Sequence, residues 1–89
     1  MVYNKVTMNE VGKVTHYYGK LGVAIVELSG DLQVGDRIKI QGKSSEFEQA
    51  VGSMEIDRQP VATAKRGDVV GLKVDGKAGE GSAVYKLEG

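Results

Sequence analysis

Apolar and polar residues alternate along short segments of this chain, and glycines separate the segments. The clearest case is residues 36–41, where Ile38 and Ile40 alternate with Arg37 and Lys39. A period of two places one set of side chains on each face of a strand, so the segment predicts a half-buried β-strand. No window keeps a 3.6-residue period, and we therefore expect little helix.

Six segments rich in Val, Ile and Tyr predict six strands. They span residues 11–18, 23–28, 36–41, 46–57, 69–74 and 82–87. The second segment is apolar on both faces except at Glu27, which favours a central position in a sheet. In the fourth, the apolar parity changes between Val51 and Met54, and this predicts a bulge or bend near Gly52.

A loop is expected at residues 60–68, which contain the single proline and a turn at 66–68, with one helical turn across 61–65. Short strands with turn signals every 8–12 residues or so are typical of a small barrel or sandwich, and closure would remove exposed strand edges. The chain of 89 residues is expected to form one all-β domain. Fraying is expected at residues 1–8 and 88–89.

Composition excludes several classes of site. The chain has no cysteine and one histidine, which argues against disulfides, thiolate metal sites and histidine clusters, so no metal or cofactor is expected. Twelve basic residues balance twelve acidic ones, which argues against a DNA partner held by bulk charge. The N-terminus lacks a signal pattern and the longest apolar run is residues 23–26, so we expect a cytoplasmic protein with no membrane partner.

The stretch GKVTHYYGKLG, residues 12–22, has the features of a binding loop. It does not fit a phosphate-binding Walker loop, because Gly12 and Gly19 are two residues too far apart and Leu21 stands where Ser or Thr is required. Aromatic side chains beside basic ones are typical of single-stranded RNA binding. The candidate RNA-binding residues here are Lys13, His16, Tyr17, Tyr18 and Lys20.

A structural interpretation of the same stretch is that it forms the first hairpin of a barrel. One tyrosine would then pack into the core, and His16 would be an ordinary surface residue. Alternation places His16 and Tyr17 on opposite faces of the strand, so all three rings face one ligand only if the strand end twists. Both interpretations stay open at this stage.

A second candidate RNA-binding patch consists of Arg58, Lys65 and Arg66. Asp57 and Asp68 flank these cations, and the alternative is a solvated loop with a tight turn.

Catalysis has little support in the sequence. Ser44 and Ser45 offer hydroxyls, but His16 is the one candidate base and nothing in the pattern joins them. No segment combines a nucleophile, an oriented base and a pocket, so we expect no catalytic residues and no enzyme.

Two phrases, LQVGDRIKIQG at residues 32–42 and VGSMEIDRQPVATAKRGDVVGLKV at residues 51–74, carry a family resemblance. They resemble the translation-protein β-barrel, the second domain of elongation factor Tu and bacterial initiation factor two. The pattern is also similar to the C-terminal barrel of U32 peptidase-like proteins and to stand-alone elongation-factor-like proteins. The matching positions are Val34, Gly35, Asp36, Val51, Ser53, Met54, Ala64, Gly67, Asp68, Val70, Gly71, Leu72 and Val74.

The resemblance implies a closed six-stranded, Greek-key-like barrel of the elongation factor Tu domain 2 type. It also implies a non-catalytic module that contacts tRNA, rRNA or a ribosomal protein. No GTPase domain accompanies the barrel, so hydrolysis is not implied. The alternative is an accessory barrel that docks on a separate partner, such as a U32 peptidase-like protein, through the fourth strand or the 61–65 loop. Gly35 and Gly67 are expected at positive φ, and Gly71 at a close backbone approach or bulge.

Overall fold

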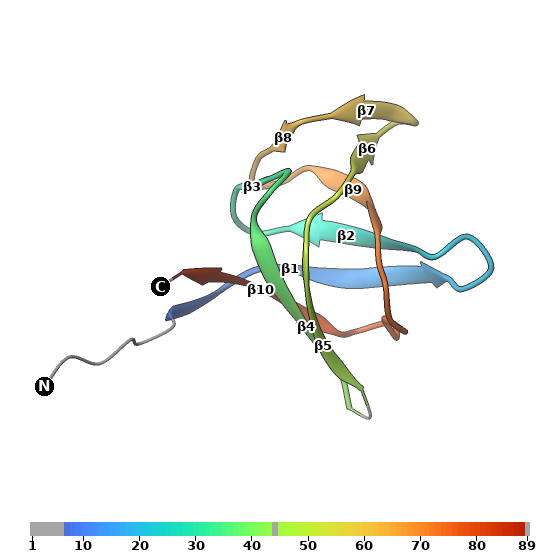
Figure 1. Ribbon diagram of the computed structural model, residues 1–89. Helices are drawn as coiled ribbons and strands as arrows, with labels where there is room; N and C mark the ends of the chain where they lie inside the picture. The colour runs from blue at the N-terminus through green and yellow to red at the C-terminus, as the bar shows by residue number, and fades with distance from the viewer. Residues whose placement is uncertain (1–6, 44, 89) are drawn as a thin grey trace, which may run out of the picture.

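The computed structural model describes residues 7–43 and 45–88, which form strands joined by turns (Figure 1). None of these residues lies in a helix, so no membrane-spanning helix is found in this part of the chain. The strands are β1 (Thr7–Tyr18), β2 (Val23–Leu28), β3 (Leu32–Gln33), β4 (Arg37–Gln41), β5 (Glu46–Ala50), β6 (Met54–Ile56), β7 (Gln59–Val61), β8 (Thr63–Ala64), β9 (Val69–Lys73) and β10 (Ala83–Glu88).

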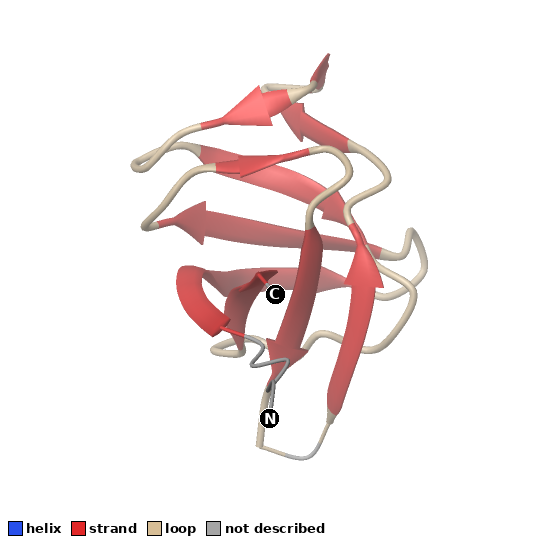
Figure 2. Ribbon diagram, turned by 60° about the vertical axis from the view of Figure 1, so that its left-hand side comes forward, coloured by secondary structure: helices blue, strands red, loops and turns tan. Residues whose placement is uncertain are grey.

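Every strand pair is antiparallel. Eight strands form one sheet in the order β5-β4-β10-β1-β2-β9-β6-β7, while β3 and β8 form a separate pair. The strands of this sheet run in different directions across Figure 2, because the sheet twists and curves. The predicted central position of residues 23–28 is confirmed, since β2 pairs with both β1 and β9.

Alternate residues of the central strands form the hydrophobic core, as their patterns predict. They include Ala24, Val26 and Leu28 of β2, Ile38 and Ile40 of β4, and Val70 and Leu72 of β9. Burying a Val, Leu or Ile side chain contributes about 1.5–3 kcal/mol relative to leaving it exposed. This inward set fixes the register of each strand, because a slip of one residue would turn the apolar set toward solvent.

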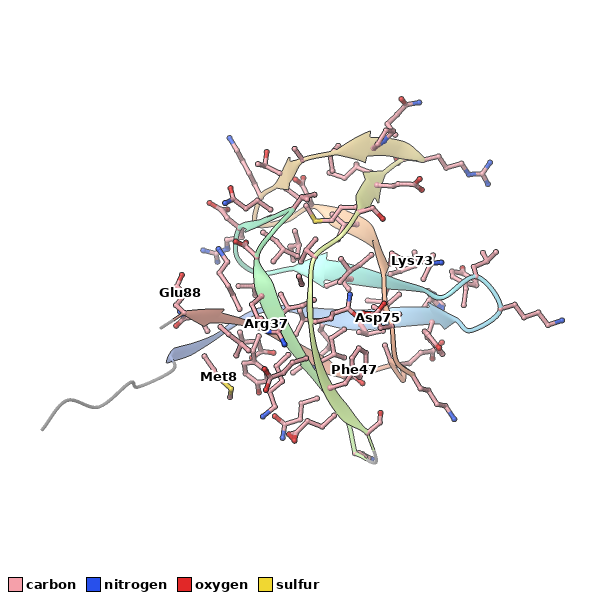
Figure 3. The ribbon with its side chains drawn as sticks, in the orientation of Figure 1. Met8, Arg37, Phe47, Lys73, Asp75 and Glu88 are labelled. Atoms are coloured by element: carbon pink, nitrogen blue, oxygen red, sulfur yellow. The ribbon has the colours of Figure 1, made fainter. Side chains whose placement is uncertain are left out.

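The edge of β5 meets the segment that follows β9 through side chains. Ser45, Phe47 and Gln49 lie at alternate positions and contact residues 73–77 in reverse order. The Ser45 hydroxyl donates to the Lys77 carbonyl at 3.1 Å, and the Gln49 amide contacts the backbone on both sides of Val74. The Phe47 ring packs directly on Gly76, and Figure 3 labels Phe47 together with Lys73 and Asp75. We call this contact the side-chain seam.

The expected closed six-stranded barrel is not observed among the described residues. The backbone ladder runs from β5 to β7, and these two end strands do not pair with each other. The difference has a physical cause: the side-chain seam joins β5 to the segment after β9 without a ladder of backbone hydrogen bonds. The all-β class is correct, while the strand count is wrong because short strands were missed.

Three predicted elements need correction. The helical turn expected across 61–65 is absent: Val61 ends β7, Thr63 and Ala64 form β8, and the N–H of Val34 donates to Ala62 O at 2.9 Å. The long fourth strand is two strands with a break at residues 51–53, where a bulge or bend was expected near Gly52. β1 begins earlier and β10 ends later than predicted, so residues 7, 8 and 88 lie within strands. The other residues for which fraying is expected, 1–6 and 89, lie outside the described residues.

The glycine predictions hold at two of three positions. Gly35 and Gly67 have φ angles of 98° and 93°, a region that favours glycine. The expectation for Gly71 is wrong: the β2–β9 register is continuous there. A Cβ atom at Gly71 would also lie 3.7 Å or more from its neighbours, which is ordinary contact.

Candidate interaction surface

A β-bulge at Thr15 decides which side chains of the first hairpin reach solvent. The β1–β2 register shifts between Val14, which faces Val26, and His16, which faces Ile25. Thr15 is the extra residue, and its hydroxyl donates to the Ile25 carbonyl at 3.3 Å. Because one residue is inserted, every later side chain in β1 points to the opposite face of the sheet from the one it would have in a regular strand.

The bulge turns Tyr17 inward. Tyr17 is opposite the buried Ala24 and packs against the hydrophobic core. Its hydroxyl donates to the Gly76 carbonyl at 3.5 Å. The prediction that one tyrosine packs inward is therefore confirmed for Tyr17, which is half-buried. Among the candidate RNA-binding residues, Tyr17 thus lies on the opposite face of the strand from His16 and Tyr18.

The same bulge places His16 and Tyr18 together on the outer face. Their rings are near-parallel, with centroids 6.3 Å apart and planes at 26°. The Nδ1 atom of His16 lies 3.3 Å from a carboxylate oxygen of Glu80, and both side chains are mostly exposed. The imidazole is thus oriented by one aromatic ring and one carboxylate. A carboxylate beside a stacking ring is unfavourable for a phosphate ligand.

Apolar side chains continue this outer surface to the tip of the hairpin. Tyr18 is 49% exposed and Leu21, in the turn, is 64% exposed. Val23 and Ile25 stand opposite Tyr18 and His16 and are half-buried. We call the set of His16, Tyr18, Leu21, Val23 and Ile25 the hairpin face.

The turn that carries Leu21 is held by hydrogen bonds. The N–H of Leu21 donates to Tyr18 O at 3.1 Å, and that of Gly22 donates to Gly19 O at 3.3 Å. Gly22 has a φ of 66°, and the ammonium of Lys73 donates to Leu21 O at 3.0 Å. The tip of the hairpin is therefore tied to β9, which limits the ordering cost of binding there.

The lysines of the first patch are exposed. Lys13 lies on the outer face in register with Glu27, and Lys20 lies in the turn. Glu10 and Glu27 balance the two lysines over the whole of β1 and β2, so Lys20 leaves a positive charge at the tip of the hairpin only. Four of the five candidates in this patch share a solvent-facing hairpin.

The second patch does not come together. Arg58 lies in the tight turn between β6 and β7, whereas Lys65 and Arg66 lie between β8 and β9 (Figure 1). The intervening residues run through β7 and β8, and an extended chain rises about 3.3 Å per residue. The N–H of Lys65 donates to Asp68 and that of Arg66 donates to Asp31, so carboxylates also lie against these cations. The three cations therefore lie at two separate turns, which fits the alternative of a solvated loop with a tight turn at residues 66–68.

The described residues offer no activated nucleophile. A hollow of about 310 Å³ is lined by Ser45, Ser82, Lys77 and Glu80, among others. Both hydroxyls in it donate to backbone carbonyls, Ser45 to Lys77 and Ser82 to Gly79, and neither donates to an imidazole. Ser44 lies outside the described residues. No group of three potential metal ligands is found in residues 7–43 and 45–88.

The sequence analysis missed the aliphatic part of the hairpin face. A signal was present: residues 23–28 are apolar on both faces except at Glu27, and the pattern predicts little helix that could cover the outer face of the sheet. The bulge at Thr15 had no such signal, because a single threonine within an alternating strand is common.

Comparisons with known proteins found a relative by sequence and solved structures with a similar fold. The chain is 42% identical over 80 residues to an uncharacterized protease of Methanocaldococcus jannaschii. The match covers 89% of this chain and 20% of the relative, so the chain spans about a fifth of the length of that protein. No protein-family model matches the sequence.

Two solved structures share the fold. Both are crystal structures of the C-terminal domain of a putative U32 peptidase from Geobacillus thermoleovorans, one of them the selenomethionine variant. The first has a TM-score of 0.82 at 20% identity and covers 86% of this chain and 90% of that one. The variant has a TM-score of 0.83 at 20% identity, with 88% and 99% covered. The chain therefore has the fold of this C-terminal domain over most of its length.

Proposed function

We propose that this chain is a non-catalytic accessory β domain that docks on the peptidase-like part of a U32 peptidase-like protein. The observation that carries the proposal is the near-complete coverage of a domain that is itself the C-terminal part of a putative U32 peptidase. The second support is the relative in which the matching segment makes up 20% of a protein named a protease.

The arrangement of polar groups supports a docking role over a catalytic one. The hydroxyls of Ser45 and Ser82 are engaged with carbonyls, and His16 is paired with Glu80 instead of with a hydroxyl. A nucleophile needs a base within hydrogen-bonding distance, whereas the hydroxyls of Ser45 and Ser82 donate to backbone carbonyls. A closed barrel of the elongation factor Tu type and a role on RNA of the translation machinery have no support among the comparisons.

A mixing experiment tests the proposal. The Methanocaldococcus protein is prepared without its matching 80-residue segment, mixed with this chain and separated by size-exclusion chromatography. The proposal predicts that the two elute together as a complex. The intact relative serves as the control, because its own segment occupies the docking site and should exclude the added chain. Separate elution of a folded deletion protein and this chain would contradict the proposal.

A chimera covers the case in which the deletion protein does not fold. In the chimera, this chain replaces the matching segment of the relative. Docked domains unfold cooperatively, whereas independent ones unfold separately. The proposal predicts one thermal transition, and two independent transitions, one of them equal to that of the isolated chain, would contradict it.

A further inference from the structure

Two surfaces suggested by the sequence are unsuited to docking. The open edge of β5 is covered by the side-chain seam, in which Gln49 contacts the backbone at Lys73 and Asp75. Residues 61–65 are engaged in the β6–β7 and β3–β8 pairs, with Ala64 buried. A partner that added a strand at either place would first have to break these contacts.

The hairpin face has what those surfaces lack. It joins two aromatic rings and three aliphatic side chains, among them Leu21, the most exposed large apolar residue in the described part of the chain. Gly71 of β9 pairs with Ile25 of β2 and has no side chain of its own. The outer surface of the sheet is therefore recessed at this point. Contiguous exposed apolar groups with a polar rim mark interaction sites.

The chemistry of the hairpin face favours protein over RNA. Leu21, Val23 and Ile25 offer neither an aromatic face to a base nor a donor to a phosphate. Tyr17 packs against the core, and the carboxylate of Glu80 places a negative charge beside the His16 ring. The rim is basic at the tip, where Lys20 lies in the turn and Lys73 donates to Leu21 O, whereas Lys13 stands opposite Glu27.

We propose that the hairpin face is the surface by which this domain docks, and that it seats in an apolar groove with a carboxylate rim on the peptidase-like part. This inference rests on the proposed function and names the site through which that function operates. Charge complementarity selects carboxylates that face the tip of the hairpin, because Lys20 lies in the turn and the ammonium of Lys73 donates to Leu21 O. The exposed ring of Tyr18 and the side chain of Leu21 are the anchors, since desolvated aromatic and aliphatic groups near the centre of an interface dominate affinity.

Calorimetric titration against the deletion protein of the relative tests this site. Leu21→Asp and Tyr18→Ser change exposed residues and are expected to weaken binding about tenfold or more. Val34→Asp is the matched control, because Val34 is 43% exposed and lies in a different turn. Lys20→Glu is expected to weaken binding several-fold and to reduce its salt dependence, while Arg58→Glu leaves both unchanged.

The outcomes separate the two proposals. Binding that is equal in Leu21→Asp and Val34→Asp overturns the hairpin face while the docking function stands. Absence of wild-type binding to a folded deletion protein overturns both. In the chimera, Leu21→Asp is expected to split the single thermal transition and Val34→Asp to leave it whole, and no split would also count against the hairpin face. Tight binding of a single-stranded RNA oligonucleotide that Tyr18→Ser abolishes would assign the surface to RNA instead.

Discussion

The Oε1 atom of Gln49 accepts a hydrogen bond from the backbone N–H of Asp75 at 2.7 Å. The Nε2 atom of the same amide donates to the carbonyl of Lys73 at 2.8 Å, and the residue is only 6% exposed. One side chain therefore takes the place of a pair of backbone hydrogen bonds between β5 and the segment after β9.

Replacing Gln49 with Leu is expected to lower the free energy of unfolding by about 1–3 kcal/mol, because two partly buried backbone groups lose their hydrogen-bond partner. Urea denaturation of the variant measures the loss. Gln41→Leu is the control: Gln41 is exposed on β4, and a change there is expected to stay within about 0.5 kcal/mol. Equal stability of the two variants would mean that the seam does not depend on the amide.

The seam shows where sequence analysis reaches its limit. Periodicity correctly places β2 at residues 23–28 and assigns the inward residues of β4 and β9. It also finds the break near Gly52, because the parity of apolar residues changes across it. It does not find β3 and β8, since two-residue strands have no period. Periodicity also gives no sign that Gln49 is buried and hydrogen-bonded to residues 24–26 positions away, because these are tertiary contacts.

The candidate site was predictable only in part, because residue types can be read from the sequence while tertiary placement cannot. The stretch 12–22 was identified as exposed and aromatic, which holds for His16 and Tyr18. The position of Tyr17 depends on one inserted residue, Thr15, which reverses the facing of the strand end. Arg58 and Lys65 are close in the sequence, but the extended residues of β7 and β8 between them place the two cations at different turns.

The two adjacent tyrosines are expected to differ in their effect on stability. Tyr17→Ala removes a ring packed against the core and should cost about 2–3 kcal/mol. Tyr18→Ala removes a half-exposed ring that contacts His16 and should cost about 1 kcal/mol or less. Guanidinium unfolding followed by far-ultraviolet circular dichroism compares the two variants. The reverse order would show that the bulge at Thr15 is misplaced.

Gly76 is expected to be intolerant of a side chain. A Cβ atom there would lie 2.8 Å from the Phe47 ring, so Gly76→Ala forces the ring to move and should cost about 1–3 kcal/mol. Gly52→Ala is the matched control, since a Cβ atom at Gly52 meets nothing within 4 Å. Thermal unfolding distinguishes them. Combining Gly76→Ala with Phe47→Leu should recover part of the loss, and strict additivity would argue against the contact.

The tight turn between β6 and β7 can be stabilised. Asp57 and Arg58 have φ angles of 52° and 66°, which non-glycine residues adopt at a cost. Two positive φ angles in a two-residue hairpin turn favour Asn-Gly. The double variant Asp57→Asn, Arg58→Gly is expected to raise the free energy of unfolding by about 0.5–1 kcal/mol. Arg66→Gly, at a position without positive φ, is expected to give no gain.

Hydrogen–deuterium exchange of this chain, alone and mixed with the deletion protein of the Methanocaldococcus relative, would show which residues the partner covers. Docking through the hairpin face predicts that the partner slows exchange in residues 18–22 and leaves the β6–β7 turn at residues 56–59 unchanged. Slower exchange at residues 56–59 or 65–68 with the hairpin unaffected, or no change anywhere, would contradict docking through the hairpin face.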